Sequence, residues 1–175
     1  IRGLPSFVDV AVVVDDASQD DTASNAMQAE RTCELVVVQG EGRGVGSAID
    51  TGHRRLLETF NSRFISVVMA GDGQMNPDDM EGMLQPIFNN RADHVKGNRI
   101  LHEDGFNNMP RYRQRASRLL SWFTTLAAGQ AVGDPQCGFT ATSSEVLRQW
   151  NWKRSWSGYG YPNFWLINLN IWDHF

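Results

Sequence analysis

Three apolar runs rich in β-branched residues and one short, more polar candidate strand occur in the first hundred residues, and they constrain the fold more than any other feature. They are VDVAVVVDD (8–16), ELVVV (34–38), FISVVMA (64–70) and ADHVKG (92–97). Each has the length of a buried strand, and segments with helical spacing separate them. Strands that alternate with helices favour a mostly parallel sheet with crossover helices on its faces. We therefore expect an α/β fold whose mostly parallel sheet is flanked by helices.

A polar cluster follows each of these runs. The clusters are Asp15-Asp16, Gly40 to Gly46, Asp72-Gly73-Gln74 and Gly97-Asn98-Arg99. In parallel sheets, ligands bind beyond the carboxyl ends of the strands. We therefore expect all four clusters to lie on one edge of the sheet and to contribute to one site.

The character of the sequence changes after residue 110. The stretch PRYRQRASRLLSWFTTLAAG (110–129) has helical spacing, with Arg111, Arg115 and Arg118 on one face. A loop, VGDPQCGFTAT, then leads into a possible strand, and SSEVLRQW opens another helix. Neither a repeat nor a linker interrupts the chain, so we treat residues 1–175 as a single domain. Both ends read as cuts through a longer protein, and we expect a fragment.

Composition narrows the class of protein. The 175 residues are 41% hydrophobic and 21% charged, as in a soluble globular domain with a real core. A net charge of -4 argues against a nucleic-acid partner. Cys33 and Cys137 are too few for a disulfide framework, which favours a reducing, cytoplasmic setting. The sequence shows neither a membrane span nor a signal peptide, although it leaves attachment to a membrane surface open.

The stretch AGDGQ (70–74) suggests a cation site. A carboxylate in a turn after a buried strand suits Mg²⁺ or Mn²⁺, which bind through one or two carboxylates and substrate phosphates. Asp72 would supply the charge and Gln74 a neutral oxygen. An exposed Asp-Gly turn with no ligand is the alternative, since such turns are common.

Two other clusters also allow both a ligand-binding and a purely structural interpretation. Asp15 and Asp16 could accept hydrogen bonds from a nucleobase and a ribose, or they could cap a helix. GEGRGVG (40–46) could cradle phosphate, but it is neither a P-loop nor a clean G-x-G-x-x-G.

Taken together and in order, these pieces resemble one family. The stretches VVVDDASQDDT, GRGVGSAIDTG, VVMAGDGQMNPDDM, ADHVKGNRI, MPRYRQRAS, GDPQCGFTA and GYGYPN are similar to those of inverting GT-A glycosyltransferases. The resemblance is to the family 2 type, which includes dolichyl-phosphate mannose synthase and polyprenyl-phosphate glycosyltransferases. It implies the Rossmann-like GT-A fold and covers residues from about 8 to 163.

The resemblance also implies roles for single residues. Asp15 and Asp16 would hold the base and ribose of a nucleotide-sugar donor, and Arg43 would help to bind it. Asp72 and Gln74 would hold Mg²⁺ or Mn²⁺ on the diphosphate. The remaining implied contacts are Arg99 with a phosphate, Arg113 and Ser117 with an acceptor phosphate, and Asp134 and Gln136 with the sugar.

Two departures from the family pattern matter. The metal motif usually begins with an aspartate two residues before Asp72, where this chain has Ala70, so metal affinity should be lower. The family domain also starts with a strand and a loop that form one wall of the base pocket. This chain begins after that point, so we expect the first strand to be missing.

The implied reaction is the transfer of a hexose from a UDP- or GDP-sugar with inversion. The cation at Asp72 would stabilise the leaving diphosphate, together with Arg99 and Arg43. A polyprenyl or dolichyl phosphate acceptor needs no general base, whereas a glycan hydroxyl does, and Asp134 is the candidate. Such an enzyme would build cell-envelope glycans while attached peripherally to the cytoplasmic face of a membrane. The oligomeric state stays open.

Two alternatives remain. One is a sugar nucleotidylyltransferase, although that class would carry a basic glycine-rich loop where VDDASQDD is acidic. The other is an inactive nucleotide-sugar-binding domain, which Ala70 and the missing strand make plausible. The tryptophans beyond residue 149 most simply pack a core, as do Met69, Met75, Met80 and Met83, and Cys137 should be buried.

Overall fold

The strands form two separate sheets in the computed structural model, which describes residues 1–98, 111–129 and 132–172. The strands are β1 (Val10–Asp15), β2 (Glu34–Gln39), β3 (Ile65–Val68), β4 (His94–Lys96) and β5 (Thr140–Ser143). The first sheet pairs β1 with β2 in parallel, with Val10 opposite Glu34 and Asp15 opposite Gln39. The second has the order β3-β5-β4, and both pairings with β5 are antiparallel.

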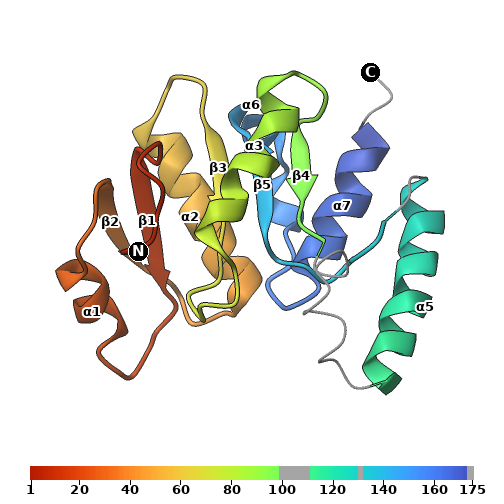
Figure 1. The fold of residues 1–175 in the computed structure, drawn as a ribbon, viewed down its shortest axis with the longest axis horizontal. Coiled ribbons are helices and arrows are strands. Elements are labelled where there is room, and N and C mark those ends of the chain that lie inside the picture. Colours follow the sequence, from red (N-terminus) through yellow and green to blue (C-terminus); the bar gives the residue numbers. More distant parts are fainter. Residues whose placement is uncertain (99–110, 130–131, 173–175) are drawn as a thin grey trace.

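The α/β class is confirmed, and the parallel arrangement holds in part. β1 and β2 are parallel, and β3 and β4 share one direction because both run against β5. The antiparallel pairings of β5 are the difference from a purely parallel sheet. The four residues of β5, TATS, carry no information about its direction. The loop before residue 140 brings β5 in from the edge at which β3 and β4 end, and this loop sets the direction (Figure 1).

Helices cover the sheets and extend the molecule sideways. They are α1 (Thr22–Gln28), α2 (Val45–Thr59), α3 (Met80–Phe88), α5 (Arg111–Ala128), α6 (Ser144–Gln149) and α7 (Tyr161–Trp172), with short 3₁₀ turns at Pro77–Asp79 and Trp152–Arg154. Helix α2 contacts both β1 and β3, so it spans the two sheets. Helix α5 packs on α7 at the edge of the molecule farthest from β2 (Figure 1).

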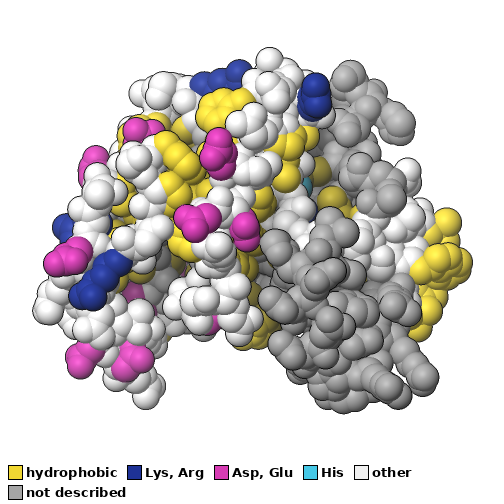
Figure 2. All heavy atoms as spheres, in the orientation of Figure 1, with side chains coloured by type: hydrophobic (Ala, Val, Ile, Leu, Met, Phe, Trp, Pro, Cys, Tyr) yellow, Lys and Arg dark blue, Asp and Glu magenta, His cyan; other side chains and the backbone are white. Residues whose placement is uncertain are grey.

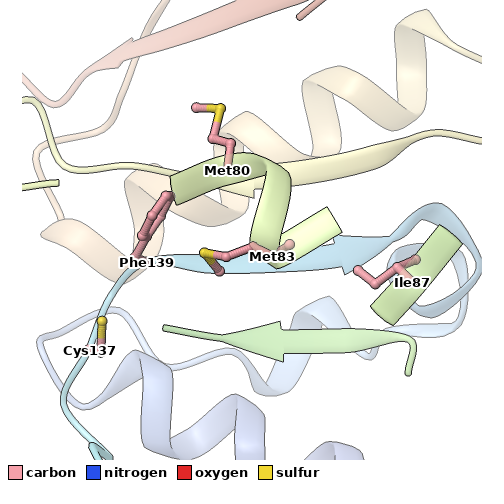
Figure 3. Packing of buried hydrophobic residues seen from close by; sticks show 6 residues of the cluster. Met80, Met83, Ile87, Cys137 and Phe139 are labelled. Carbon is pink, nitrogen blue, oxygen red and sulfur yellow. The ribbon is translucent and has the colours of Figure 1, made fainter. Parts of the chain in front are cut away.

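One core lies between α3 and β5 (Figure 3). Met80, Met83 and Ile87 of α3 pack against Cys137, Phe139 and Ala141, all of them buried. Asn76 precedes Pro77, and its side chain accepts a hydrogen bond from the Asp78 N–H, as expected where a helix starts at proline. The expected burial of Cys137 and the packing roles of the methionines are confirmed; Met69 and Met75 pack against the same cluster.

A second core surrounds Trp165 of α7. Its ring stacks on Trp150 with centroids 4.0 Å apart, and Leu147 and Tyr161 complete the buried cluster. The expected packing role is thus confirmed for Trp150 and Trp165, whereas Trp156 is 53% exposed.

Two histidine rings lie beside Trp165, with centroids 5.4 Å and 6.2 Å from it for His53 and His94. The Nδ1 atom of His53 lies 3.1 Å from Ser66 Oγ, and that of His94 lies 2.8 Å from Thr142 Oγ1. Burial lowers the pKa of His53 to about 4. Burial, followed by the charges of Lys96 and His53, lowers the pKa of His94 to about 3. His94 is only partly buried as a residue, but its Nε2 atom is shielded from solvent and has no hydrogen-bond partner. Because both pKa values lie well below 7, both rings are neutral at pH 7.

Candidate active site

The ends of β1, β3 and β4 lie on one edge of the molecule, the lower edge in Figure 1. This edge carries the loops that follow those strands and the loop that enters β5. The predicted clusters at Asp15-Asp16, residues 40–46, Asp72 to Gln74 and residues 97–98 are therefore on one side, as expected. Arg99 lies outside the described residues.

The carboxylate of Asp16 holds the glycine-rich loop. Its Oδ1 accepts the Gly42 N–H and its Oδ2 accepts the Gly44 N–H, both at 2.8 Å. A Cβ at Gly40 would lie only 2.5 Å from Asp16 Oδ1, so only glycine allows this approach. Asp15 is buried, and its Oδ1 accepts the Ser18 N–H at 3.0 Å. Asp15 thus shapes its own loop and Asp16 the loop after β2, and neither caps α1, whose first residue is Thr22.

Four backbone donors of the glycine-rich loop and the start of α2 are already paired, those of Gly42, Gly44, Gly46 and Ser47. The Gly46 and Ser47 N–H groups at the start of α2 both donate to the Ser157 carbonyl, at 2.8 Å and 3.3 Å. With Gly42 and Gly44 bound to Asp16, this loop offers little as a backbone phosphate cradle. Its contribution to a ligand is Arg43, whose exposed guanidinium forms an ion pair with Glu41.

The turn after β3 presents Asp72 and Gln74 to solvent. Asp72 Oδ1 accepts the Gln74 N–H at 3.0 Å, and Oδ2 makes no hydrogen bond or ion pair to any residue described. Gly73 has a φ of +74°, a conformation that favours glycine. Met75 anchors the turn, since it packs in the α3 core and its Sδ accepts the Ala70 N–H.

The donor set at this turn fits a hard cation. A carboxylate oxygen and an amide oxygen are ligands that Mg²⁺ and Mn²⁺ accept, and open space surrounds Gly71 and Gly73. Within the described part of the chain, no three His, Cys, Asp or Glu side chains gather around a common point. A cation at Asp72 would therefore take most of its ligands from water and a bound diphosphate.

The loop before β5 packs on the end of β4. The Gly97 N–H donates to the Phe139 carbonyl at 2.8 Å, and the Lys96 ammonium donates to the Cys137 carbonyl. Asp134 is buried, and its Oδ1 accepts the Gln136 N–H at 3.2 Å. A Cβ at Gly133 would lie 2.3 Å from the side-chain amide nitrogen of Asn98, so a larger residue there would require the Asn98 side chain to move. The structure thus brings Asp134 and Gln136 to the same edge as Asp72.

Positions 113 and 117 fall in the first half of α5. Only the backbone is described there, so the predicted acceptor contacts of Arg113 and Ser117 stay predictions. By helical spacing, these positions share a face with Thr124, which is buried toward the protein. At Thr124, the helix face that also carries positions 113 and 117 is therefore directed toward the protein.

Sequence reasoning missed two features of this edge. The Ser157 carbonyl cannot be recognised from a side chain, although GYGYPN follows it directly. Lys96 lies within the stretch ADHVKGNRI, in which we assigned a role only to Arg99 and overlooked the lysine.

Comparison with known proteins identifies the family. The sequence profile of Glycosyl transferase family 2 matches residues 9–150. The chain belongs to glycosyltransferase family 2. It is 30% identical over 154 residues to a UDP-N-acetylglucosamine–dolichyl-phosphate N-acetylglucosaminyltransferase of Methanococcus voltae, covering 80% of the chain and 61% of that relative.

Two further relatives of this family 2 chain come from Methanocaldococcus jannaschii, and both are uncharacterized proteins. One is 30% identical over 139 residues (79% of the chain, 55% of the relative), and the other is 26% identical over 168 residues (91% and 69%). The chain thus spans about three fifths of the length of the first two relatives.

Proposed function

We propose that this chain forms the donor-binding part of a glycosyltransferase that moves a sugar from a nucleotide sugar to a polyprenyl phosphate. The observation that carries the proposal is the family match together with the Asp72–Gln74 turn at the ends of the strands. The Methanococcus voltae relative is named for UDP-N-acetylglucosamine and dolichyl phosphate, so these are the first donor and acceptor class to test.

Asp72 Oδ2 and the Gln74 amide oxygen would hold Mg²⁺ or Mn²⁺. A cation bound there neutralises charge on the diphosphate leaving group. Asp16 retains acceptor capacity for ribose hydroxyls while it holds the loop that carries Arg43. Arg43 would add a charge-assisted contact to the diphosphate at the cost of its exposed pair with Glu41, a small loss because exposed ion pairs are weak.

A phosphate acceptor suits the chemistry of this edge. An acceptor phosphate oxygen is already anionic, so it can attack the anomeric carbon while the carbon–oxygen bond to the diphosphate breaks, with inversion. Arg113 and Ser117 would orient it. A glycan hydroxyl would need a base, and Asp134 is buried with Oδ1 held by the Gln136 N–H, which favours a positioning role.

The test is calorimetric titration of the intact protein with UDP-N-acetylglucosamine and GDP-mannose, with and without Mn²⁺. We expect Mn²⁺-dependent binding that Asp72→Asn weakens at least about tenfold, because the variant keeps the turn but loses the charged ligand. Asp78→Asn is the matched control, since Asp78 is an exposed carboxylate six residues away and should leave binding unchanged. Unaltered binding by Asp72→Asn would refute the cation site, and no binding of either donor would refute a site for these two nucleotide sugars.

Transfer assays with undecaprenyl phosphate and an oligosaccharide then separate the acceptors. Transfer to the lipid phosphate that Arg113→Ala abolishes would support the proposal, and unimpaired transfer by this variant would remove Arg113 from the site. A polyprenyl acceptor is held in a bilayer, so the enzyme would work at a membrane surface. In the parts of the chain that the structure describes, no helix is long and apolar enough to cross a bilayer.

A further inference from the structure

The polarity of α5 is inverted relative to an ordinary surface helix. Four of its large apolar side chains point away from the protein: Leu119, Trp122, Phe123 and Leu126 are 52% to 71% exposed. The Trp122 and Phe123 rings touch edge to face with centroids 4.9 Å apart, so the surface is continuous. Figure 2 shows apolar side chains gathered at the edge of the molecule where Figure 1 places α5.

The side of α5 that faces the protein carries three hydroxyl side chains beside the partly buried Leu120. Thr124 is buried and bonds back to the Leu120 carbonyl at 2.8 Å. The Ser121 hydroxyl donates to the Val132 carbonyl, and Thr125 Oγ1 accepts the Val132 N–H at 3.0 Å. An amphipathic helix of a soluble domain normally turns its apolar stripe to the core. Because α5 does the opposite, its outward face is built to meet another apolar phase.

The charge of α5 indicates what that phase is. The helix contains four arginines and no acidic residue, in a chain of net charge -4. By helical spacing, positions 111, 115 and 118 fall on the same side as Trp122. By position on the helix, arginines in the first half thus share a side with apolar and aromatic residues in the second half, the composition of helices that lie in the interface of an anionic membrane.

A second copy of the chain fits this face poorly. In an antiparallel pair of α5 helices, the arginines of each copy would lie against the apolar half of the other. In a parallel pair, arginine would face arginine. Either arrangement would desolvate positive charges without an acidic partner on the helix.

We propose that the outward face of α5 docks in the plane of an anionic membrane surface, with Leu119, Trp122, Phe123 and Leu126 inserted at the boundary between headgroups and acyl chains. The choice of a lipid partner rests on the proposed polyprenyl-phosphate acceptor. In this orientation, the face of α5 that carries positions 113 and 117 turns from the bilayer toward the protein. The helix would thereby receive a lipid-linked phosphate at the level of the headgroups.

The test places a fluorescent reporter on the helix. Leu126→Cys is labelled with bimane in the intact protein, and Phe88→Cys, at a 67% exposed apolar position on α3, is the matched control. Cys33 and Cys137 are buried and should label poorly. The protein is mixed with vesicles of phosphatidylcholine and phosphatidylglycerol that contain brominated lipid, without donor or acceptor, so the outcome does not depend on transfer activity.

We expect brominated lipid to quench bimane at position 126 several-fold more than at position 88. Quenching should weaken in vesicles of phosphatidylcholine alone and at high salt, because the arginines contribute through charge. Trp122→Ser in the labelled protein should reduce the quenching at position 126 relative to the labelled protein that retains Trp122. A soluble protein with an unchanged circular dichroism spectrum would show that this variant is folded. Equal quenching at positions 126 and 88, or shielding of position 126 by a second copy in the absence of vesicles, would overturn the proposal.

Discussion

Acidification from pH 7 to pH 5 should destabilise the chain through His53 and His94. Both rings have a folded-state pKa below the ordinary value of 6.5, at about 4 and about 3. At pH 5 they are therefore neutral in the folded chain, whereas the same side chains in the unfolded chain are almost fully protonated. The unfolded state binds more protons, so stability falls as the pH falls below 6.5.

The magnitude follows from the pH interval. At pH 5, the unfolded-state pKa lies roughly 1.5 units above the pH, which corresponds to about 2 kcal/mol for each histidine. The two together should lower the free energy of unfolding by about 4 kcal/mol relative to pH 7. The folded-state values hardly enter at this pH, because both lie below it. Burial raises the pKa of Asp50, a change that acts in the opposite direction and is common to all variants.

Urea denaturation at the two pH values measures this loss. The control is the double variant His53→Asn/His94→Asn, whose amides can reach Ser66 and Thr142 but do not titrate. Other titrating groups are the same in both proteins and cancel in the comparison. We expect the pH-dependent loss to be about 4 kcal/mol smaller in the variant. An equal loss in both proteins would refute the reasoning that the two rings are buried and neutral.

Three further predictions concern steric fit, core packing and side-chain hydrogen bonds, and all can be measured by denaturation at pH 7. Gly46→Ala should lower the free energy of unfolding by about 2 kcal/mol or more, because its Cβ would lie 2.0 Å from the Trp156 carbonyl oxygen. A Cβ at Gly82 in α3 would meet no other atom, so Gly82→Ala should instead stabilise the chain by up to about 1 kcal/mol. Equal effects of the two substitutions would contradict the steric explanation. Leu147→Ala, at a fully buried position, should cost about 2 to 5 kcal/mol, against less than about 0.5 kcal/mol for the exposed Leu126→Ala. Arg148→Ala should cost about 1 to 2 kcal/mol, since its Nη2 donates to the carbonyls of residues 60–62, and Arg148→Met, which keeps the packing but not the donors, should cost nearly as much.

The sequence was most informative where a pattern has one structural meaning. The valine-rich runs predicted β1 and β2, and Pro77 predicted the start of a helical segment before α3. The shared edge of the clusters followed from strand direction alone. Direction could not be predicted for β5, because a short tetrapeptide such as TATS fits either orientation.

Hydrogen bonds in which the backbone is a partner were harder to foresee. A carboxylate after a strand looks the same in sequence whether it binds a ligand or a neighbouring loop. Asp16 holds the N–H groups of Gly42 and Gly44, and the start of α2 is paired with the Ser157 carbonyl far along the chain. Likewise, helical spacing located the apolar stripe of α5 but did not show whether that stripe faces the protein or the solvent.

The separation of the two sheets has a mechanical consequence. Among the described strands, β1 and β3 share no hydrogen bond, and α2 packs against both. Asp16 and Asp72 therefore stand on halves whose spacing is governed by side-chain packing along α2. Substitutions in the middle of that helix should therefore alter the distance between the two carboxylates.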